Sequence, residues 1–144
     1  MPSVLVIYHS DTGNTRSLAE RIAQGAAEVA GVKVSLISAG ELEINDAAEA
    51  DALAIGSPDY FSYVAGSVKT FFDKVLYDER FKNKPYVAFG THGGGAKVLG
   101  RIEALAKAVG LRRVQPGLLV QGAPTREHEG PARQLGKALA EAVL

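Results

Sequence analysis

The chain has no cysteine, and this absence excludes several kinds of chemistry at once. Disulfides, zinc–thiolate sites, iron–sulfur clusters and cysteine nucleophiles all need that side chain. We predict no metal site in this protein.

The sequence also lacks a long apolar run and an excess of charge of either sign. No stretch approaches the about 20 apolar residues of a membrane span, and the start Met1-Pro2-Ser3 lacks the basic region of a signal peptide. Lys plus Arg and Asp plus Glu number 16 each, and the longest basic cluster is the pair Arg112-Arg113. We therefore expect a cytoplasmic protein that binds neither a membrane nor a nucleic acid.

Strand patterns and helix patterns alternate along the 144 residues, which fit one domain over residues 1–144. Apolar, β-branched runs predict strands over 3–8, 32–37, 52–56, 86–89 and 118–120. Apolar positions that recur every three or four residues predict helices over 18–29, 68–75, 98–109 and 135–143. We expect Gly31 and Gly110 to be helix C-caps, and Asn45-Asp46 to cap a short helix that ends at residue 50.

This alternation predicts an α/β fold with a five-stranded parallel sheet and helices on both faces. At five strands, the doubly wound order 2-1-3-4-5 is favoured. Ligands in such sheets lie at the carboxyl ends of the strands, near the switch between the first and third strands. The loops after the first, third and fourth strands are therefore the candidates for a binding site.

The first of these loops is rich in hydrogen-bonding groups and stands directly before a helix. Free N–H groups and a partial positive charge at a helix N-terminus bind anions, and Gly13 lets the backbone wrap closely. The loop contains no Lys or Arg, so we predict a phosphate cradle that works through hydrogen bonds, made of Ser10, Asp11, Thr12, Gly13, Asn14 and Thr15. The alternative is that Asn14 or Thr15 only caps the helix.

From the first strand into the following helix, the sequence resembles the flavodoxin family. The signature of that family is filled by Val6-Ile7-Tyr8, Ser10, Gly13, Thr15, Ala19 and Ile22. The resemblance implies a flavodoxin-like sandwich of three layers, in which this loop binds the phosphate of FMN. The loop lacks the Gly-Lys-Ser/Thr of a P-loop and the Gly-x-Gly-x-x-Gly of a dinucleotide site.

Three aromatic residues lie close together after the third strand: Tyr60, Phe61 and Tyr63. Beside an anion cradle they favour a stacking surface for a flat ligand over an apolar plug on the sheet edge. The stretch also resembles the flavin loop of flavodoxin-like NAD(P)H:quinone oxidoreductases, through Pro58, Phe61, Ala65-Gly66 and Thr70-Phe71. We assign six residues of this loop to the flavin site: Pro58, Asp59, Tyr60, Phe61, Ser62 and Tyr63. Four of them depart from the oxidoreductase pattern, namely Asp59, Tyr60, Ser62 and Tyr63.

The loop after the fourth strand contains three consecutive glycines, which are costly to order. Such a cost is typical of a backbone that approaches a ligand closely, or of a mobile loop. The resemblance implies that this loop contacts the polar edge of the flavin ring, so the predicted site is completed by Thr91, His92, Gly93, Gly94 and Gly95. The alternative for His92 is a solvent-exposed loop histidine.

The resemblance covers nearly the whole chain and implies an FMN-binding electron-transfer protein that serves redox partner proteins. Pro116-Gly117-Leu118 and Ala123-Pro124-Thr125 resemble the end of the flavodoxin module in A-type flavoproteins. The alternative is an enzyme that uses NAD(P)H to reduce a quinone or another small acceptor. Neutral charge and the lack of glycine between Ser57 and Tyr63 favour the enzyme, whereas the short chain favours the carrier. A homo-oligomer is left open, and no residue is assigned a catalytic role.

Overall fold

The strands form one parallel sheet in the order β2-β1-β3-β4-β5, which confirms the order predicted from the sequence. The computed structural model describes residues 1–144, with strands β1 (Ser3–Tyr8), β2 (Lys33–Ser38), β3 (Ala52–Pro58), β4 (Pro85–His92), β5 (Arg112–Arg113) and β6 (Leu118–Gln121). Both β5 and β6 pair with β4. The predicted fifth strand is therefore β6, and the short β5 is an addition.

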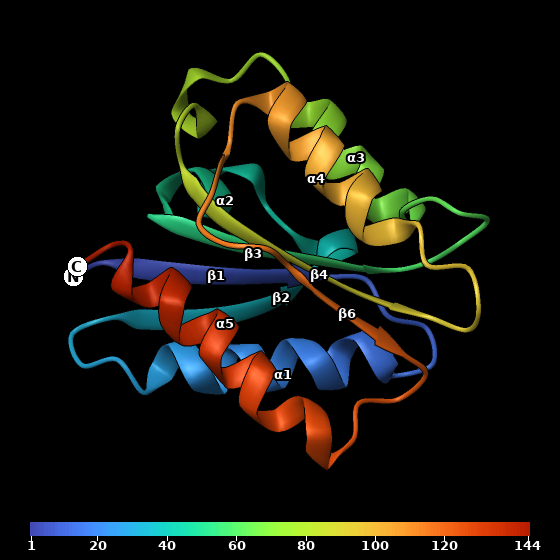
Figure 1. The fold of residues 1–144 in the computed structure, drawn as a ribbon. Helices are drawn as coiled ribbons and strands as arrows, with labels where there is room; N and C mark the ends of the chain where they lie inside the picture. The colour runs from blue at the N-terminus through green and yellow to red at the C-terminus, as the bar shows by residue number, and fades with distance from the viewer.

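Helices cover both faces of the sheet, as Figure 1 shows. One face carries α1 (Asn14–Ala27) and α5 (Glu129–Glu141), and the other carries α2 (Ile44–Glu49), α3 (Gly66–Val75) and α4 (Val98–Val109). Three short 3₁₀ turns join these elements: η1 (Ala39–Glu41), η2 (Glu79–Phe81) and η3 (Arg126–His128). None of the helices combines the length and the apolar character that crossing a bilayer requires.

The central strands are apolar throughout because alternate side chains enter two separate cores. In β1, Val4 and Val6 pack on the α1 and α5 side, whereas Leu5 and Ile7 pack on the side of α2, α3 and α4.

Two glycines let α1 and α5 approach each other closely. A Cβ added at Gly25 would lie 2.1 Å from the carbonyl oxygen of Arg133, and one at Gly136 would lie 1.9 Å from that of Ile22. Any side chain at either position would push the two helices apart.

Several expected boundaries are wrong: α1 begins at residue 14 rather than 18, and α5 begins at residue 129 rather than 135. Local hydrogen bonds explain two further differences. The α1 helix ends at Ala27, because residues 28 and 29 bond three residues back in a tighter turn, so Gly31 (φ 85°) follows the cap. The α2 helix begins at Ile44, since the carbonyl of Glu43 accepts its first bonds, and Asn45-Asp46 lie inside it. The last helix ends at residue 141 rather than 143. The C-cap expected at Gly110 is confirmed, with φ 97°.

Parallel strands bring their carboxyl ends to one edge, so the loops after β1, β3, β4 and β6 meet there. Figure 1 shows these loops at the right of the view and both chain termini at the opposite end. This is the edge at which doubly wound sheets bind ligands.

Candidate functional site

The N-terminus of α1 leaves backbone N–H groups free, because no side chain caps this helix. Gly13 precedes it with φ 98°, a left-handed conformation that strains residues with a side chain. The N–H of Gly13 donates to Ser10 Oγ at 3.1 Å, so the loop folds back over the helix start. The alternative in which Asn14 or Thr15 only caps the helix is wrong, and the helix start is open to an anion.

The hydroxyl of Thr15, one of the predicted donors, has a partner inside the protein. Its Oγ1 lies 2.8 Å from Oγ1 of Thr91, and both residues are buried. This hydrogen bond joins the first turn of α1 to the end of β4. Thr15 and Thr91 therefore hold the first and third loops together.

Residues 60–63 form a β-hairpin at the tip of the β3–α3 loop. The N–H of Tyr60 donates to the carbonyl of Tyr63 at 2.9 Å, and the reverse bond measures 3.0 Å. Phe61 and Ser62 form the turn with φ 56° and 64°, as a type I′ turn requires. Such turns favour Asn and Gly, so two ordinary residues there carry strain of about 1–2 kcal/mol each.

Asp59 holds this hairpin to the start of α4. Its Oδ1 accepts the N–H of Ser62 at 2.9 Å, and its Oδ2 accepts the N–H groups of Lys97 and Val98, both at 3.0 Å. The carboxylate therefore caps α4 from a different loop. Three hydrogen bonds and the partial positive charge of the helix N-terminus offset its negative charge.

A network of side chains joins the cradle to the hairpin. The Tyr60 hydroxyl donates to Oδ2 of Asp11, and Nε2 of His9 lies 3.1 Å from the same oxygen. Nδ1 of His9 lies 2.7 Å from Oγ of Ser67, and the His9 and Tyr60 rings meet edge to face at 5.9 Å. Burial, and then the bond to Asp11, raise the pKa of Tyr60 to about 12. The Tyr60 hydroxyl, and then His9, lower the pKa of Asp11.

Two adjoining cavities, which share Thr12, bring together most of the predicted site residues. The first, of about 470 Å³, is lined by Tyr8, Ser10, Asp11, Thr12, Gly13, Arg16, Ser38 and Glu41. The second, of about 170 Å³, is lined by Thr12, Asn14, Pro58, Asp59, Tyr60, Thr91, His92, Gly93 and Gly122. Six predicted residues line neither cavity: Thr15, Phe61, Ser62, Tyr63, Gly94 and Gly95.

Five residues that line these cavities were not assigned to the site from the sequence: Tyr8, Arg16, Ser38, Glu41 and Gly122. Ser38, Glu41 and Gly122 lie at or just after the ends of β2 and β6, so the rule for carboxyl ends could have found them. A third cavity, of about 380 Å³, lies at the amino ends of β1 and β2 and is lined by no predicted site residue. It lies away from every loop considered above, so we place the functional site at the carboxyl edge.

Packing inside the protein does not require glycine at any of the three consecutive glycine positions of the β4–α4 loop. A Cβ at Gly93 or Gly94 would meet no atom within 4 Å, and one at Gly95 would lie 3.9 Å from Asp59 Oδ1. Beside them, the buried Nδ1 of the half-buried His92 has no hydrogen-bond partner. Buried polar atoms are nearly always paired in proteins, so His92 is the exception among the side chains at this edge.

Comparisons of the sequence with a family model and with known proteins agree on one family. A family model described as Flavodoxin matches residues 6–135. A flavodoxin of Aquifex aeolicus is 36% identical over 98% of this chain and 86% of its own length. A type A flavoprotein of Rhodobacter capsulatus is 30% identical over 96% of this chain, which spans only 33% of that relative.

Solved structures agree with the sequence comparisons. A flavodoxin from the domain Archaea has a TM-score of 0.91 and 28% identity, with 98% of both chains covered. A flavodiiron core from Synechocystis has a TM-score of 0.87 and 25% identity, covering 99% of this chain and 36% of its own.

Proposed function

The chain belongs to the flavodoxin family, and on this premise we propose that the three loops at the carboxyl edge hold one FMN as the redox centre of an electron-transfer protein. FMN joins a phosphate to a flat heterocycle, so its site needs an anion cradle beside a planar surface. Two adjoining cavities at this edge support the proposal.

The first cavity suits the phosphate. It adjoins the uncapped start of α1 and is lined by the hydroxyls of Ser10 and Thr12. Arg16 lines the same cavity and adds a positive charge, which it shares with Glu20 at 3.8 Å, and the carboxylate of Glu41 also lines the cavity. Asp11 also lines it, but its carboxylate is held by Tyr60 and His9, which reduces its repulsion of a phosphate.

The second cavity suits the flat ring. It is lined by Pro58 and Tyr60 from the β3–α3 loop and by Thr91, His92 and Gly93 from the end of β4 and the loop after it. His92 lines this cavity, and the bare backbone of the glycines can bond polar atoms on the edge of the ring.

Bound FMN supplies the electron chemistry, because it can be reduced and reoxidised. The residues of this chain bind and orient it. The Thr15–Thr91 bond fixes the distance between the loops, and Asp59 fixes the hairpin against α4. Flavodoxins pass electrons to redox partner proteins, and the hairpin exposes its outer face for such a contact.

The single observation that carries the proposal is the uncapped helix start facing the same edge as the Tyr60 hairpin. Titration of the FMN-free protein with FMN, followed by quenching of flavin fluorescence, tests it. We expect one equivalent to bind, and riboflavin, which lacks the phosphate, to bind at least about tenfold more weakly. Thr12→Val should weaken FMN binding, whereas Thr70→Val, on the exposed side of α3, should not. No binding of FMN would refute the proposal.

The same samples test the reductase alternative. We expect the FMN-loaded protein to oxidise NADH only slowly in the presence of benzoquinone, measured at 340 nm. Rapid turnover that saturates with NADH would favour the enzyme over the carrier.

A further inference from the structure

We propose that the Phe61 tip and three cations beside it form a docking surface for an acidic protein that accepts electrons. The docking surface consists of Phe61, Lys69, Lys97 and Arg101. The inference rests on the proposed function, since it takes FMN at the same edge to be the electron source. It adds the chemical class of the partner, which neither the fold nor the family comparisons supply.

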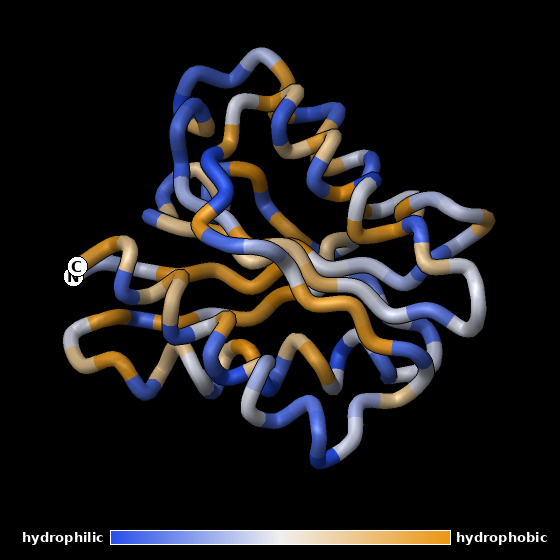
Figure 2. The backbone as a smooth tube through the Cα atoms, in the orientation of Figure 1, coloured by the Kyte–Doolittle hydropathy of each residue, from blue (hydrophilic) through white to orange (hydrophobic).

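Phe61 is the most exposed large apolar residue of the chain. Its exposure is 103%, compared with 90% for Tyr77 and 85% for Met1. Figure 2 shows the tip of the β3–α3 loop as a hydrophobic point flanked by more polar backbone. A single exposed aromatic is ordinary, but this one stands on a turn that carries backbone strain. Strain of this kind persists only where surrounding contacts hold it.

Several hydrogen bonds hold the tip of the hairpin in place. Tyr60 and Tyr63 pair across it, Asp59 accepts the N–H of Ser62, and Nε of Arg101 donates to the Ser62 carbonyl at 3.1 Å. None of these bonds uses the Phe61 side chain. The ring is therefore presented outward on a fixed backbone, so little further entropy is lost when a partner covers it.

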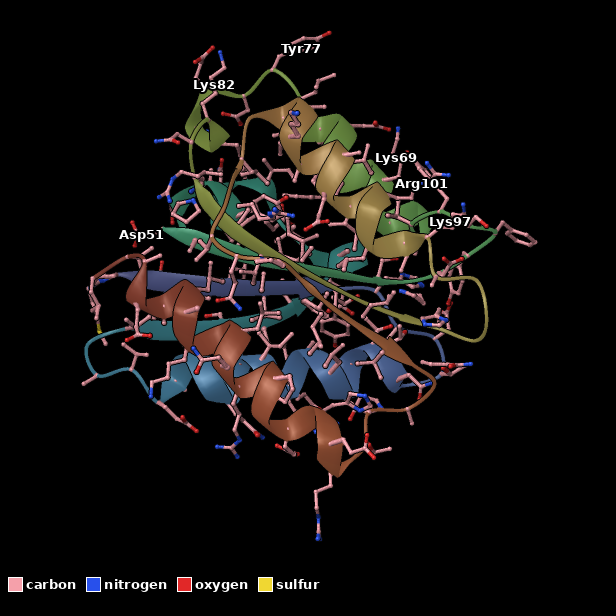
Figure 3. The ribbon with its side chains drawn as sticks, viewed as in Figure 1. Asp51, Lys69, Tyr77, Lys82, Lys97 and Arg101 are labelled. Atoms are coloured by element: carbon pink, nitrogen blue, oxygen red, sulfur yellow. The ribbon has the colours of Figure 1, made fainter.

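The charges around the tip are mainly positive once their partners are counted. Figure 3 shows Lys69 on α3 and Lys97 and Arg101 at the start of α4, all at the end of the molecule that carries the loops. Lys97 and Arg101 are exposed, and neither forms an ion pair; Lys69 pairs with Asp73.

The carboxylates nearest the tip are already engaged. Asp59 accepts three backbone N–H groups, two of them at the start of α4. Asp11 accepts the Tyr60 hydroxyl and faces His9. The phosphate of bound FMN would lie in the cradle, where the N–H groups and dipole of α1 offset its charge. Lys97 and Arg101 therefore dominate the rim beside Phe61.

The charge of the whole chain is segregated in the same sense, although its net charge is zero. Residues 66–110 contain eight Lys or Arg and four Asp or Glu, whereas residues 39–51 contain five Asp or Glu and no Lys or Arg. Arg80, Lys82 and Lys84 of the first segment lie away from the Phe61 tip, and Lys84 Nζ donates to the carbonyls of Ala48 and Ala50 beside α2. The positive charge at the tip itself therefore comes from Lys69, Lys97 and Arg101, and such local charge attracts an acidic partner.

The shape of the surface favours a protein over a small anion. None of the three cavities described above is lined by Phe61, Lys69, Lys97 or Arg101. Aromatic residues and Arg are also the types that dominate the energetics of protein interfaces.

A pair of acceptors that differ only in charge tests the proposal: native cytochrome c, which is basic, and its succinylated form, which is acidic. Each haem takes one electron, so two haems oxidise one reduced FMN, and the flavin protons pass to the solvent. The FMN-loaded protein is reduced with one equivalent of dithionite and mixed with either form in a stopped-flow instrument. Calorimetric titration of the oxidised protein with oxidised cytochrome c gives binding without electron transfer.

We expect the succinylated form to be reduced about tenfold faster than the native form at low ionic strength, and to bind more tightly. Salt at 0.5 M should bring the two rates together, because it screens exposed charges. Lys97→Glu/Arg101→Glu should abolish the preference. Phe61→Asn, which keeps a residue that tolerates a left-handed turn, should slow both acceptors without changing the salt dependence. Lys82→Glu, at the far end in Figure 3, is the control and should change nothing.

FMN affinity is measured for every variant, so that the two proposals fail separately. Loss of FMN binding in the parent protein would refute the proposed function. A parent protein that binds FMN but reduces native cytochrome c at the same rate or faster would overturn the docking surface alone. A dimer in sedimentation that Phe61→Asn disperses would also overturn it, by assigning the tip to a second copy of the chain.

Discussion

The β1–α1 loop and the β3–α3 hairpin lie against each other at one edge of the sheet, but they are held in different ways. The loop places glycine where the backbone is left-handed and leaves the N–H groups of α1 unpaired. The hairpin places Phe61 and Ser62 in left-handed positions and pairs its polar groups with neighbouring elements. The first is a conformation its own residues favour, and the second is imposed by tertiary contacts. The first suits a region that must receive a ligand, and the second suits one that must keep its shape.

Asp59→Ala should have the largest effect, because it removes the acceptor for three backbone N–H groups at once. We expect the free energy of unfolding to fall by about 2 kcal/mol, measured by urea denaturation. Asp73→Ala, which breaks only the exposed pair with Lys69, is the matched control and should have little effect. Equal effects of the two variants would show that the hairpin does not depend on Asp59.

Gly13→Ala tests the opposite kind of loop. A Cβ there meets no atom within 4 Å, so the expected cost comes only from φ 98°. Relaxation of that strain would move the N–H groups of the cradle, and we expect FMN to bind about tenfold more weakly. Gly40→Ala, which also has open space and no left-handed backbone, should bind FMN as the parent does. An unchanged affinity for FMN in Gly13→Ala would show that FMN binding does not depend on the left-handed backbone at Gly13.

Ser62→Gly should change stability in the other direction from Gly13→Ala. Glycine removes the strain at φ 64°, and after its own entropy cost we expect a gain of about 0.5 kcal/mol in the free energy of unfolding. Ser62→Ala keeps the strain and should show no gain. If both variants behaved alike, the turn would not be strained.

Tyr60→Phe should have the smallest effect, because Asp11 is exposed. The Tyr60 hydroxyl is the first cause of the lowered pKa of Asp11, so its loss should move that pKa back toward 3.8. In the parent protein this bond contributes stability above the ordinary pKa of Asp11, and the contribution is lost as the pH falls through the lowered value. Carboxyl NMR titration checks the shift, and an unmoved pKa would contradict the bond.

At alkaline pH the stability that the Tyr60–Asp11 pair contributes changes with pH in the opposite direction. The pKa of Tyr60 is raised to about 12, so its contribution to stability is present below its ordinary value of 10.0 and is lost as the pH rises toward 12. In Asp11→Asn the ultraviolet titration of Tyr60 should move down but stay above 10.0, since burial is the larger cause.

The sequence predicts the cradle from a local signal. Gly13, the hydroxyls and the helix that follows are neighbours along the chain, and helix geometry then turns the free N–H groups toward the loop. It predicted the hairpin only as a cluster of aromatic residues. Nothing local showed that Phe61 would point outward while Tyr60 lines the cavity, because that depends on Asp11 and Asp59.

The order of the strands followed from the sequence alone, because parallel strands and right-handed crossovers leave few topologies. The rule that such sheets bind ligands at the carboxyl ends of their strands then gives the predicted place of the site. Only the tertiary structure decided which groups remained free to bind. The hydroxyls of Thr15 and Thr91 form a hydrogen bond with each other, and the Asp59 carboxylate accepts backbone N–H groups at the start of α4. Nδ1 of His92 has no hydrogen-bond partner. The first two outcomes depend on hydrogen bonds between residues more than 30 positions apart, and the third depends on the lack of a partner for His92. Patterns among neighbouring residues predict neither.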